Sequence, residues 1–418
     1  MAWVTYREGA AYGEEISFHE LAARFGTPTY IYSAQQVQES LGLLGRAFAD
    51  LPVQVFYAVK ANANGALLRL LRRAGIGAEV VSGGELVRAR KAGFPPHQIV
   101  FTGVGKTSQE IGLALEQGIR ALIVESLPEL GEVARVARNR GVQAPVGLRV
   151  NPALDPNTHP HLATGKGGSK FGLELSQVEQ ALAYIRSDSS VSLVGFHLHL
   201  GSQIEQVALY RVAWELLLDL WQLAQRRELN PQFLDLGGGF AVPYLAGSPF
   251  PLEELAALLR GRVPEGCVVL VEPGRFIVAE AGVLLTRVLY VKEVHGRTLV
   301  VVDAGMNDFL RPALYGARHP IWPVKRRPGS PRRVDLVGPV CENADLLAQE
   351  VELPPLVSGD LLVVGKAGAY GFAMSSQYNS RPRPAEVLLL EGEAYLVRER
   401  ETVTDLWHKE EVPPCLAG

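Results

Sequence analysis

An alternation of short apolar runs with helix-like segments, between about residues 50 and 275, restricts the fold of this 418-residue chain most strongly. The runs are rich in β-branched residues and predict strands, whereas the segments between them repeat apolar residues every three or four positions and predict helices. Eight such units fit a (β/α)8 TIM-like barrel better than an open doubly wound sheet. The predicted strands are Val53–Val59, Ala78–Val81, Ile99–Thr102, Ala121–Val124, Val146–Val150, Leu193–Leu200, Phe233–Leu236 and Cys267–Val271.

After Pro273 the helical spacers nearly vanish and strand-like runs punctuated by Gly and Pro follow, which predicts an antiparallel β-sandwich or small barrel. The runs are Val283–Val294, Thr298–Val302, Arg333–Leu336, Asp360–Val364, Glu386–Leu390 and Glu393–Arg398. We expect a barrel domain over residues 28–275 and a β-rich domain formed by residues 1–27 and 276–418. The Pro- and Arg-rich segment Pro320–Pro331 is expected to be a solvated loop.

Charge and composition exclude several function classes. The formal charge of −3 leaves no basic stripe for a phosphate backbone, so no nucleic-acid partner is expected. Uncharged apolar runs fall short of the roughly 20 residues of a membrane helix, and no secretory signal is visible at the N-terminus. Three widely spaced cysteines form neither a disulfide framework nor a metal site, so we expect a cytoplasmic protein without a metal.

Polar and ionisable residues gather directly after the predicted strands, where barrels build their active sites. Lys60 ends the first strand, His197 and His199 end the sixth, the glycines Gly237, Gly238 and Gly239 follow the seventh, and Glu272 and Arg275 follow the eighth. Position alone leaves alternatives open. Lys60 is either a Schiff-base nucleophile or a lysine whose amine extends to water. The glycines either bind an anion or form a tight turn. Glu272 and Arg275 either bind a ligand or form an internal salt bridge.

Together these groups are the parts that hold pyridoxal 5'-phosphate (PLP). A lysine bonds the aldehyde of PLP, and glycine amides and an arginine bind its phosphate. A carboxylate keeps the pyridine nitrogen protonated, and an imidazole stacks on the ring. The better stacking candidate is His199, because Gly201 and Ser202 lie beside it, whereas His197 reads as a core or supporting group.

Longer motifs resemble those of the fold-type III PLP-dependent decarboxylases. They are YAVKAN (Tyr57–Asn62), SGGE (Ser82–Glu85), THPHLATGKGGSKFG (Thr158–Gly172), HLHLGSQI (His197–Ile204), LDLGGGF (Leu234–Phe240) and EPGR (Glu272–Arg275). Three more, Asp303–Tyr315, Gly338–Asp345 and Gly368–Leu388, are similar to the diaminopimelate decarboxylase family in particular. The resemblance covers nearly the whole chain.

The resemblance implies a role for each matching residue. Lys60 would bond the cofactor aldehyde and His199 would lie against the ring, while Cys341 would return a proton after carbon dioxide leaves. The remaining cofactor-binding residues would be Ser202, Gly237, Gly238, Gly239, Glu272, Gly274, Arg275 and Tyr370. The substrate would be held by Arg275, Arg311, Tyr315, Glu342 and Tyr370.

The implied activity is decarboxylation of meso-2,6-diaminopimelate to L-lysine, the last step of lysine biosynthesis by that route. In the family the cysteine and its neighbouring glutamate come from the partner subunit, so the resemblance implies a homodimer with shared active sites, completed by the β-rich domain. One departure is Asn343, which follows Glu342 where the family has Ser or Thr. The alternatives are a related decarboxylase of ornithine, arginine or a carboxypolyamine, a non-catalytic regulatory relative, and a cofactor-free Schiff-base lyase.

Overall fold

The computed structural model describes residues 1–152 and 170–416, and the chain divides into two compact units. The barrel unit comprises Glu39–Pro243 and Ser248–Ile277, and the β unit comprises Met1–Gln38, Tyr244–Gly247 and Val278–Gly418. Among the helices of the described residues, none is both long enough and apolar enough to cross a membrane.

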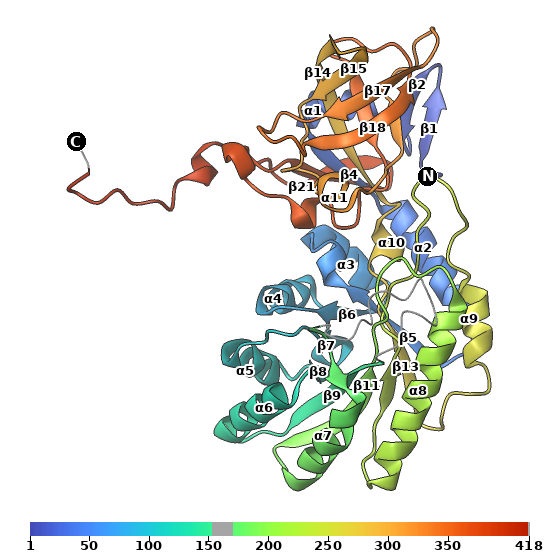
Figure 1. The fold of residues 1–418 in the computed structure, drawn as a ribbon, viewed down its shortest axis with the longest axis vertical. Coiled ribbons are helices and arrows are strands. Elements are labelled where there is room, and N and C mark those ends of the chain that lie inside the picture. The colour runs from blue at the N-terminus through green and yellow to red at the C-terminus, as the bar shows by residue number, and fades with distance from the viewer. Residues whose placement is uncertain (153–169, 417–418) are drawn as a thin grey trace. The chain divides into compact units, whose positions relative to one another are not determined.

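Eight parallel strands close into a ring in the barrel unit, which confirms the predicted TIM-like fold (Figure 1). Each strand pairs with the next one, and the last pairs with the first through Val269 and Val53. A further two-residue strand, β10 (Leu173–Glu174), extends the pairing of β9. The ring runs β5 (Val53–Ala58), β6 (Gly77–Val80), β7 (Ile99–Phe101), β8 (Ala121–Val124), β9 (Ala144–Asn151), β11 (Val191–His197), β12 (Phe233–Asp235) and β13 (Val268–Val271).

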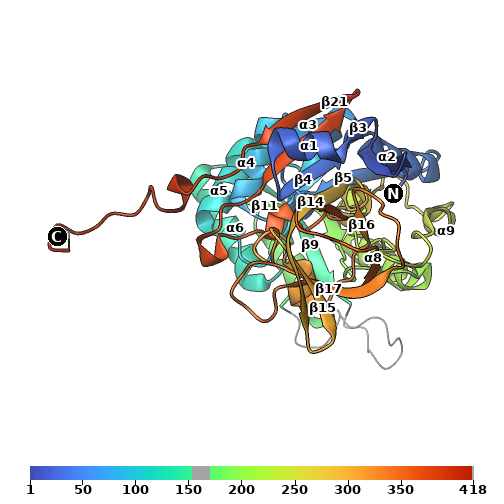
Figure 2. The same cartoon turned by 90° about the horizontal axis from the view of Figure 1, so that it is seen from above.

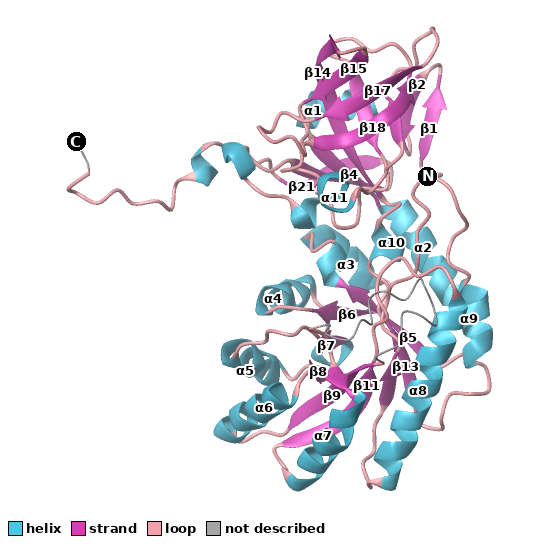
Figure 3. Cartoon of the chain, viewed as in Figure 1, coloured by secondary structure: helices cyan, strands magenta, loops and turns pink. Residues whose placement is uncertain are grey.

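Helices surround these strands (Figure 3). The ends of these helices carry capping residues that can be recognised in the sequence. Thr107 and Glu110 form a capping box at the start of α5, and Gly118 ends this helix in the left-handed conformation. The helices are α2 (Ala34–Ala47), α3 (Gly65–Arg73), α4 (Gly83–Ala92), α5 (Ser108–Gln117), α6 (Leu127–Arg140), α7 (Leu175–Ser187), α8 (Val207–Arg226), α9 (Leu252–Leu259) and α10 (Arg275–Val278).

Aromatic and branched side chains fill the barrel interior. Phe56, Val100, Ile123, Phe233 and Leu270 belong to one buried cluster. Glycine makes room for the large rings, since a Cβ on Gly195 would lie 2.5 Å from the ring of Phe233. The barrel is therefore a packed core, and only one end of its strands is open to chemistry.

A mixed sheet dominates the β unit, with the order β18-β17-β15-β14-β4-β20-β21. The predicted β-rich class is confirmed, but the sheet is not purely antiparallel, because β15 pairs with β17 and β4 pairs with β20 in parallel. β15 and β17 run side by side in both views (Figure 1 and Figure 2). The strands are β4 (Thr29–Ser33), β14 (Gly282–Val294), β15 (Arg297–Val302), β17 (Arg332–Val337), β18 (Leu346–Leu353), β20 (Ala385–Leu390) and β21 (Glu393–Arg398).

Short elements complete the β unit. Strands β1 (Val4–Arg7), β2 (Ala10–Gly13) and β3 (Ile16–Ser17) form a small antiparallel sheet. They are followed by α1 (Phe18–Phe25), and later by α11 (Arg311–Tyr315), β16 (Ile321–Pro323) and β19 (Leu361–Val364). Residues of β1 to β3 and of α1 pack on the main sheet, with Trp3, Phe18 and Leu21 in one buried cluster with Val283 and Leu389.

Two expectations differ from the structure. β4 pairs with β14 and β20 inside the β unit, although the expected barrel domain began at residue 28. All five β4 residues are buried between β14 and β20, and the local sequence TYIYS does not indicate these distant partners. The solvated loop expected over Pro320–Pro331 was partly wrong, because Ile321–Pro323 form β16, paired with β19, and Ile321 and Val324 are buried.

Candidate active site

Lys60 lies at the open end of the barrel, on the short 3-10 helix Val59–Ala61 that follows β5. Its Nζ is 2.9 Å from Oε2 and 3.1 Å from Oε1 of Glu79, a fully buried residue of β6. The hydroxyl of Thr102, which follows β7, donates to the same carboxylate. The amine is therefore held at the strand ends by a buried carboxylate, and its role as a Schiff-base nucleophile stays a prediction.

Glu272 follows β13 and is buried against His197, the last residue of β11. Nε2 of His197 lies 3.2 Å from Oε2 of Glu272. Burial raises the pKa of Glu272, but the charge of His197 and its hydrogen bond outweigh burial, so this pKa lies below its usual range. Glu272 is therefore an anion within the barrel.

His199 stands two residues beyond β11 and is partly buried. Its Nδ1 accepts a hydrogen bond of 3.3 Å from the backbone N–H of Gly238. Burial lowers the pKa of His199 well below its usual value, and the positive charges of Lys60 and Arg149 lower it further. The ring is therefore neutral, as a flat group stacking on another ring should be.

The glycine triplet meets a steric requirement. A Cβ on Gly238 would lie 2.2 Å from the carbonyl oxygen of Glu272, and one on Gly239 would lie 2.3 Å from that of Gly201. Gly237 and Gly239 also have positive φ angles, of 65° and 94°. The tight-turn alternative is therefore correct, and phosphate binding by the same backbone stays a prediction.

Gly274 and Arg275 bring the start of α10 to the same end of the barrel. A Cβ on Gly274 would lie 2.9 Å from that of Ala58 and 3.0 Å from that of Ala61, so glycine lets this segment approach the Lys60 turn. Nη2 of Arg275 donates to the hydroxyl of Ser202 over 3.1 Å. The guanidinium and this hydroxyl thus form one donor group at the strand ends.

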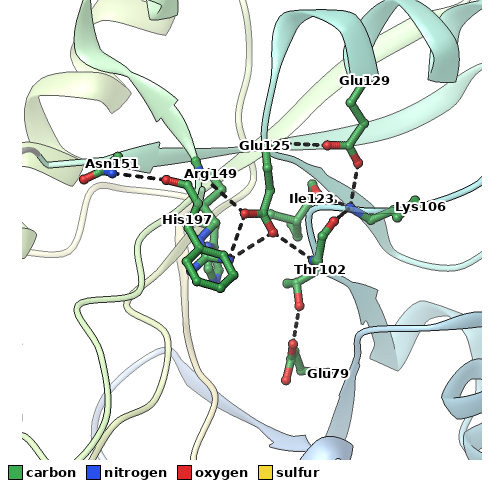
Figure 4. A network of polar contacts seen from close by, with 12 residues as sticks. Glu79, Thr102, Lys106, Ile123, Glu125, Glu129, Arg149, Asn151 and His197 are labelled. Atoms are coloured by element: carbon green, nitrogen blue, oxygen red, sulfur yellow. Dashed lines mark hydrogen bonds and ion pairs between the residues drawn. The ribbon is translucent and has the colours of Figure 1, made fainter. Parts of the chain in front are cut away.

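Glu125 organises the neighbouring strand ends (Figure 4). Its carboxylate lies 3.0 Å from Nη1 of Arg149 on β9 and accepts the N–H groups of Gly103 (2.8 Å) and Gly172 (3.2 Å). The pair is buried, with exposed side-chain fractions of 11% for Arg149 and 2% for Glu125. The remaining part of the Thr158–Gly172 motif, residues 158–169, lies outside the described residues.

The other predicted site residues belong to the β unit. Arg311 begins α11, is buried, and stacks over the ring of Tyr244 at 5.2 Å, while its Nε lies 3.4 Å from Nε2 of His319. Tyr315 ends the same helix, with 63% of its surface exposed. Tyr370 has a positive φ of 55°, which is unusual for a tyrosine, so this backbone conformation determines the direction in which its side chain leaves the chain.

Cys341 and Glu342 lie in one exposed cluster of the β unit. The backbone N–H of Cys341 donates to Oδ1 of Asn379 over 2.7 Å, and the hydroxyl of Tyr378 lies 3.4 Å from Oε2 of Glu342. Asn343 supports Glu342 through its backbone N–H, which donates to Oε1 over 3.1 Å. The departure from the family pattern at Asn343 thus leaves this backbone support in place.

Three charged residues of the barrel site, Glu79, Arg149 and Asp235, were not predicted. Glu79 and Arg149 lie within the buried strands β6 and β9, and Asp235 is the last residue of β12. A charge in a buried strand needs a partner, so this pattern was a usable signal.

The groups present fit PLP by their chemistry. The open end of the barrel combines a lysine amine, a buried anionic carboxylate, a neutral imidazole and the Arg275–Ser202 donor group. An amine, a carboxylate and a cationic donor are the groups that the aldehyde, the pyridine nitrogen and the phosphate of PLP require.

Comparisons with known proteins agree with this chemistry. Residues 34–279 match the family model described as pyridoxal-dependent decarboxylase, pyridoxal binding domain. A diaminopimelate decarboxylase of Pseudomonas aeruginosa is 43% identical, covering 98% of this chain and 99% of that protein, and one of Aquifex aeolicus is 41% identical, covering 96% and 95%. A crystal structure of diaminopimelate decarboxylase from M. jannaschii in complex with L-lysine has a TM-score of 0.94 at 36% identity, covering 99% and 98%.

The matched region includes the barrel strands that carry Lys60, His199 and Glu272, and the relatives extend the match through the β unit. This chain is 41–43% identical to two diaminopimelate decarboxylases over almost the entire length of each compared pair. The chain therefore belongs to the pyridoxal-dependent decarboxylases and, among them, to the diaminopimelate decarboxylase family.

Proposed function

We propose that this protein uses PLP to decarboxylate meso-2,6-diaminopimelate to L-lysine and carbon dioxide in the cytoplasm, as the last step of lysine biosynthesis by that route. The observation that carries the proposal is the meeting of Lys60, His199 and Glu272 at the open end of a closed barrel, in a chain that matches diaminopimelate decarboxylases along its length. Bound PLP supplies an electron sink for the pair left behind when carbon dioxide departs.

The barrel residues bind and orient the cofactor. The Lys60 amine would hold the cofactor through its aldehyde, and Glu79 keeps this amine at the strand ends. Glu272, as an anion, retains a proton on the pyridine nitrogen. Arg275, Ser202 and the backbone of Gly237, Gly238, Gly239 and Gly274 face the phosphate, while Tyr370 adds a hydroxyl from the β unit. His199 would lie against the cofactor ring and exclude water from it.

The β unit supplies the substrate groups. Arg311 and Tyr315, one helical turn apart, bind a carboxylate together with Arg275. Glu342 binds the distal ammonium, and the Cys341 thiol donates the proton that replaces carbon dioxide. The distal end of diaminopimelate carries both an ammonium and a carboxylate. Lysine or ornithine leaves protein charges unmatched there, which penalises these substrates.

The exposure of Cys341 and Glu342 supports a homodimer in which each subunit lends these residues to its partner. Mixing two inactive variants, Lys60→Ala and Cys341→Ala, tests this arrangement. If a site draws Lys60 from one chain and Cys341 from the other, randomly mixed dimers regain about a quarter of the wild-type activity, because half the dimers are mixed and one of their two sites is intact. No recovery after subunit exchange contradicts shared sites.

The activity itself is tested by incubation with meso-diaminopimelate and PLP, followed by chiral analysis for L-lysine. Ornithine, arginine and a carboxypolyamine are compared in parallel, and faster turnover of any of them favours that related decarboxylase. Borohydride reduction and peptide mapping should label Lys60. Cys341→Ala should retain this label and lose turnover, whereas the matched control Cys415→Ala, another exposed cysteine, should retain both. A colourless, inert protein favours the non-catalytic alternative.

A further inference from the structure

Two carboxyl groups and an imidazole are buried together inside the barrel. Asp235, the last residue of β12, is fully buried, and Glu272 and His197 are 2% and 1% exposed. One oxygen of each carboxyl group and one nitrogen of His197 lie within 4.8 Å of one another. Two anions this close in a dry interior repel strongly, so both cannot be ionised without a compensating positive charge.

Each carboxyl group of the pair has one oxygen that accepts a hydrogen bond or faces a ring nitrogen and one that does not. Oδ1 of Asp235 accepts the N–H of Gly237 over 2.8 Å, and Oε2 of Glu272 faces Nε2 of His197. Oδ2 of Asp235 and Oε1 of Glu272 are buried and find no donor among residues 1–152 and 170–416. Two ionised carboxylates cannot satisfy each other, because each only accepts. A single proton on one of them satisfies both.

We propose that Asp235 is a positioning residue that holds this proton as a neutral carboxylic acid and donates it to Glu272. The donated hydrogen bond fixes the carboxyl plane of Glu272 and stabilises its negative charge. Where the proposed function holds, Glu272 then presents a fixed anion to the pyridine nitrogen. The free lone pairs of a carboxylate leave room for that contact beside those from His197 and Asp235.

The charged surroundings favour this distribution of the proton. Burial raises the pKa of Asp235 well above its usual value, and the negative charges of Glu272 and of Glu79 on β6 raise it further. Arg120 is the nearby cation and favours ionisation of Asp235, but its own burial lowers its pKa. Glu272 instead forms a hydrogen bond with His197 and faces the positive charge of Lys60, and these interactions lower its pKa. Asp235 is therefore the acid of the pair and Glu272 the anion.

Infrared spectroscopy of the full-length, PLP-loaded protein at neutral pH tests the proton directly. A protonated carboxyl group has a carbonyl stretch that carboxylates lack, and we expect this band to shift in protein labelled with 13C-aspartate. Asp235→Asn should remove the band, fold normally, and retain PLP affinity within about threefold, because an amide also donates to Glu272 and accepts from Gly237. The exposed control Asp219→Asn should leave the band unchanged.

The labelled wild-type spectrum decides the question even where Asp235→Asn does not fold. Asp308→Asn and Asp345→Asn identify the contributions of Asp308 and Asp345, two further buried aspartates with raised pKa values. Absence of an aspartic acid band beyond those of Asp308 and Asp345 overturns the proposal. A divalent cation bound stoichiometrically to the purified protein and lost in Asp235→Asn also overturns it, because the same three groups could ligate a metal instead.

Stability gives a second readout on the apoprotein. The folded wild type retains a proton that the unfolded chain releases above pH 4, so its folding equilibrium constant should fall relative to that of Asp235→Asn by tenfold per pH unit above that value. A constant ratio between pH 5 and 7 overturns the proposal. These readouts are independent of turnover. An inactive protein that shows the band refutes the proposed function and leaves the inference about Asp235 intact.

Discussion

Replacing Glu125 by Gln should destabilise the barrel unit because it leaves the Arg149 guanidinium buried without its anion. The pair has a 3.0 Å contact and exposed side-chain fractions of only 11% and 2%. Removing one partner of a buried pair typically costs about 3–5 kcal/mol. Gln retains one acceptor for Gly103 or Gly172, and the ring of Phe171 lies 4.7 Å from the guanidinium. We therefore expect the low end, about 3 kcal/mol.

The assay is urea unfolding of the full-length protein followed by circular dichroism, applied to a double-mutant cycle of Glu125→Gln and Arg149→Met. The cycle should give a coupling energy of about 2 kcal/mol. Arg227 and Glu179 provide a matched control in the same unit. Their contact is shorter, at 2.8 Å, but their exposed fractions are 46% and 62%, so their coupling should stay below about 0.5 kcal/mol.

Equal coupling energies in the two cycles would refute the reasoning, because distance rather than burial would then set the strength of the pairs. A coupling energy for Glu125 and Arg149 below about 0.5 kcal/mol would refute it as well.

Two further outcomes follow from the barrel site. In urea unfolding, Gly238→Ala should lower the free energy of unfolding by about 3 kcal/mol or more and weaken PLP binding, because its Cβ would clash with backbone atoms of Glu272. The control Gly65→Ala should be neutral or stabilising, because its Cβ would meet nothing within 4 Å. Equal effects of the two substitutions would contradict the steric argument. Burial raises the pKa of Glu85 to about 7, so the folded protein holds a proton that the unfolded chain releases from about pH 4.5. Glu85 should therefore contribute a fall of at most about 3 kcal/mol in the free energy of unfolding as pH rises from 4.5 to 7, and Glu85→Gln should lose less stability than the wild type over this range in urea unfolding.

The barrel was predictable because its signals are local. Each of the eight strands begins and ends within two or three residues of its prediction, since a run of β-branched residues bounded by Gly or a helix cap is a short-range pattern. The sequence of β4, TYIYS, is also rich in strand-forming residues, but it does not show which domain the strand joins. Its partners β14 and β20 lie more than 240 residues later in the chain.

Among the site residues, too, those with a local sequence signal were predicted, and those that depend on contacts between distant strands were not. Lys60, His199 and Glu272 were found because polar groups interrupt the ends of apolar strands, and the structure brings them to one end of the barrel. Glu79 and Asp235 were not predicted. A charge within an apolar strand indicates that a partner is needed, but no spacing along the sequence shows that Glu79 pairs with Lys60 or that Asp235 lies beside Glu272. The substrate roles of Arg311, Cys341 and Glu342 depend on the resemblance to the family and stay predictions.

The pairing of β4 also orders events during protein synthesis. The barrel strands from Val53 to Val271 emerge from the ribosome as one uninterrupted stretch, so the barrel can close while the rest of the chain is still being made. β4 leaves the ribosome before all of them, yet one of its two neighbours, β20, begins only at Ala385. A truncation before that residue should therefore leave a nascent strand with an open edge, which is a template for aggregation.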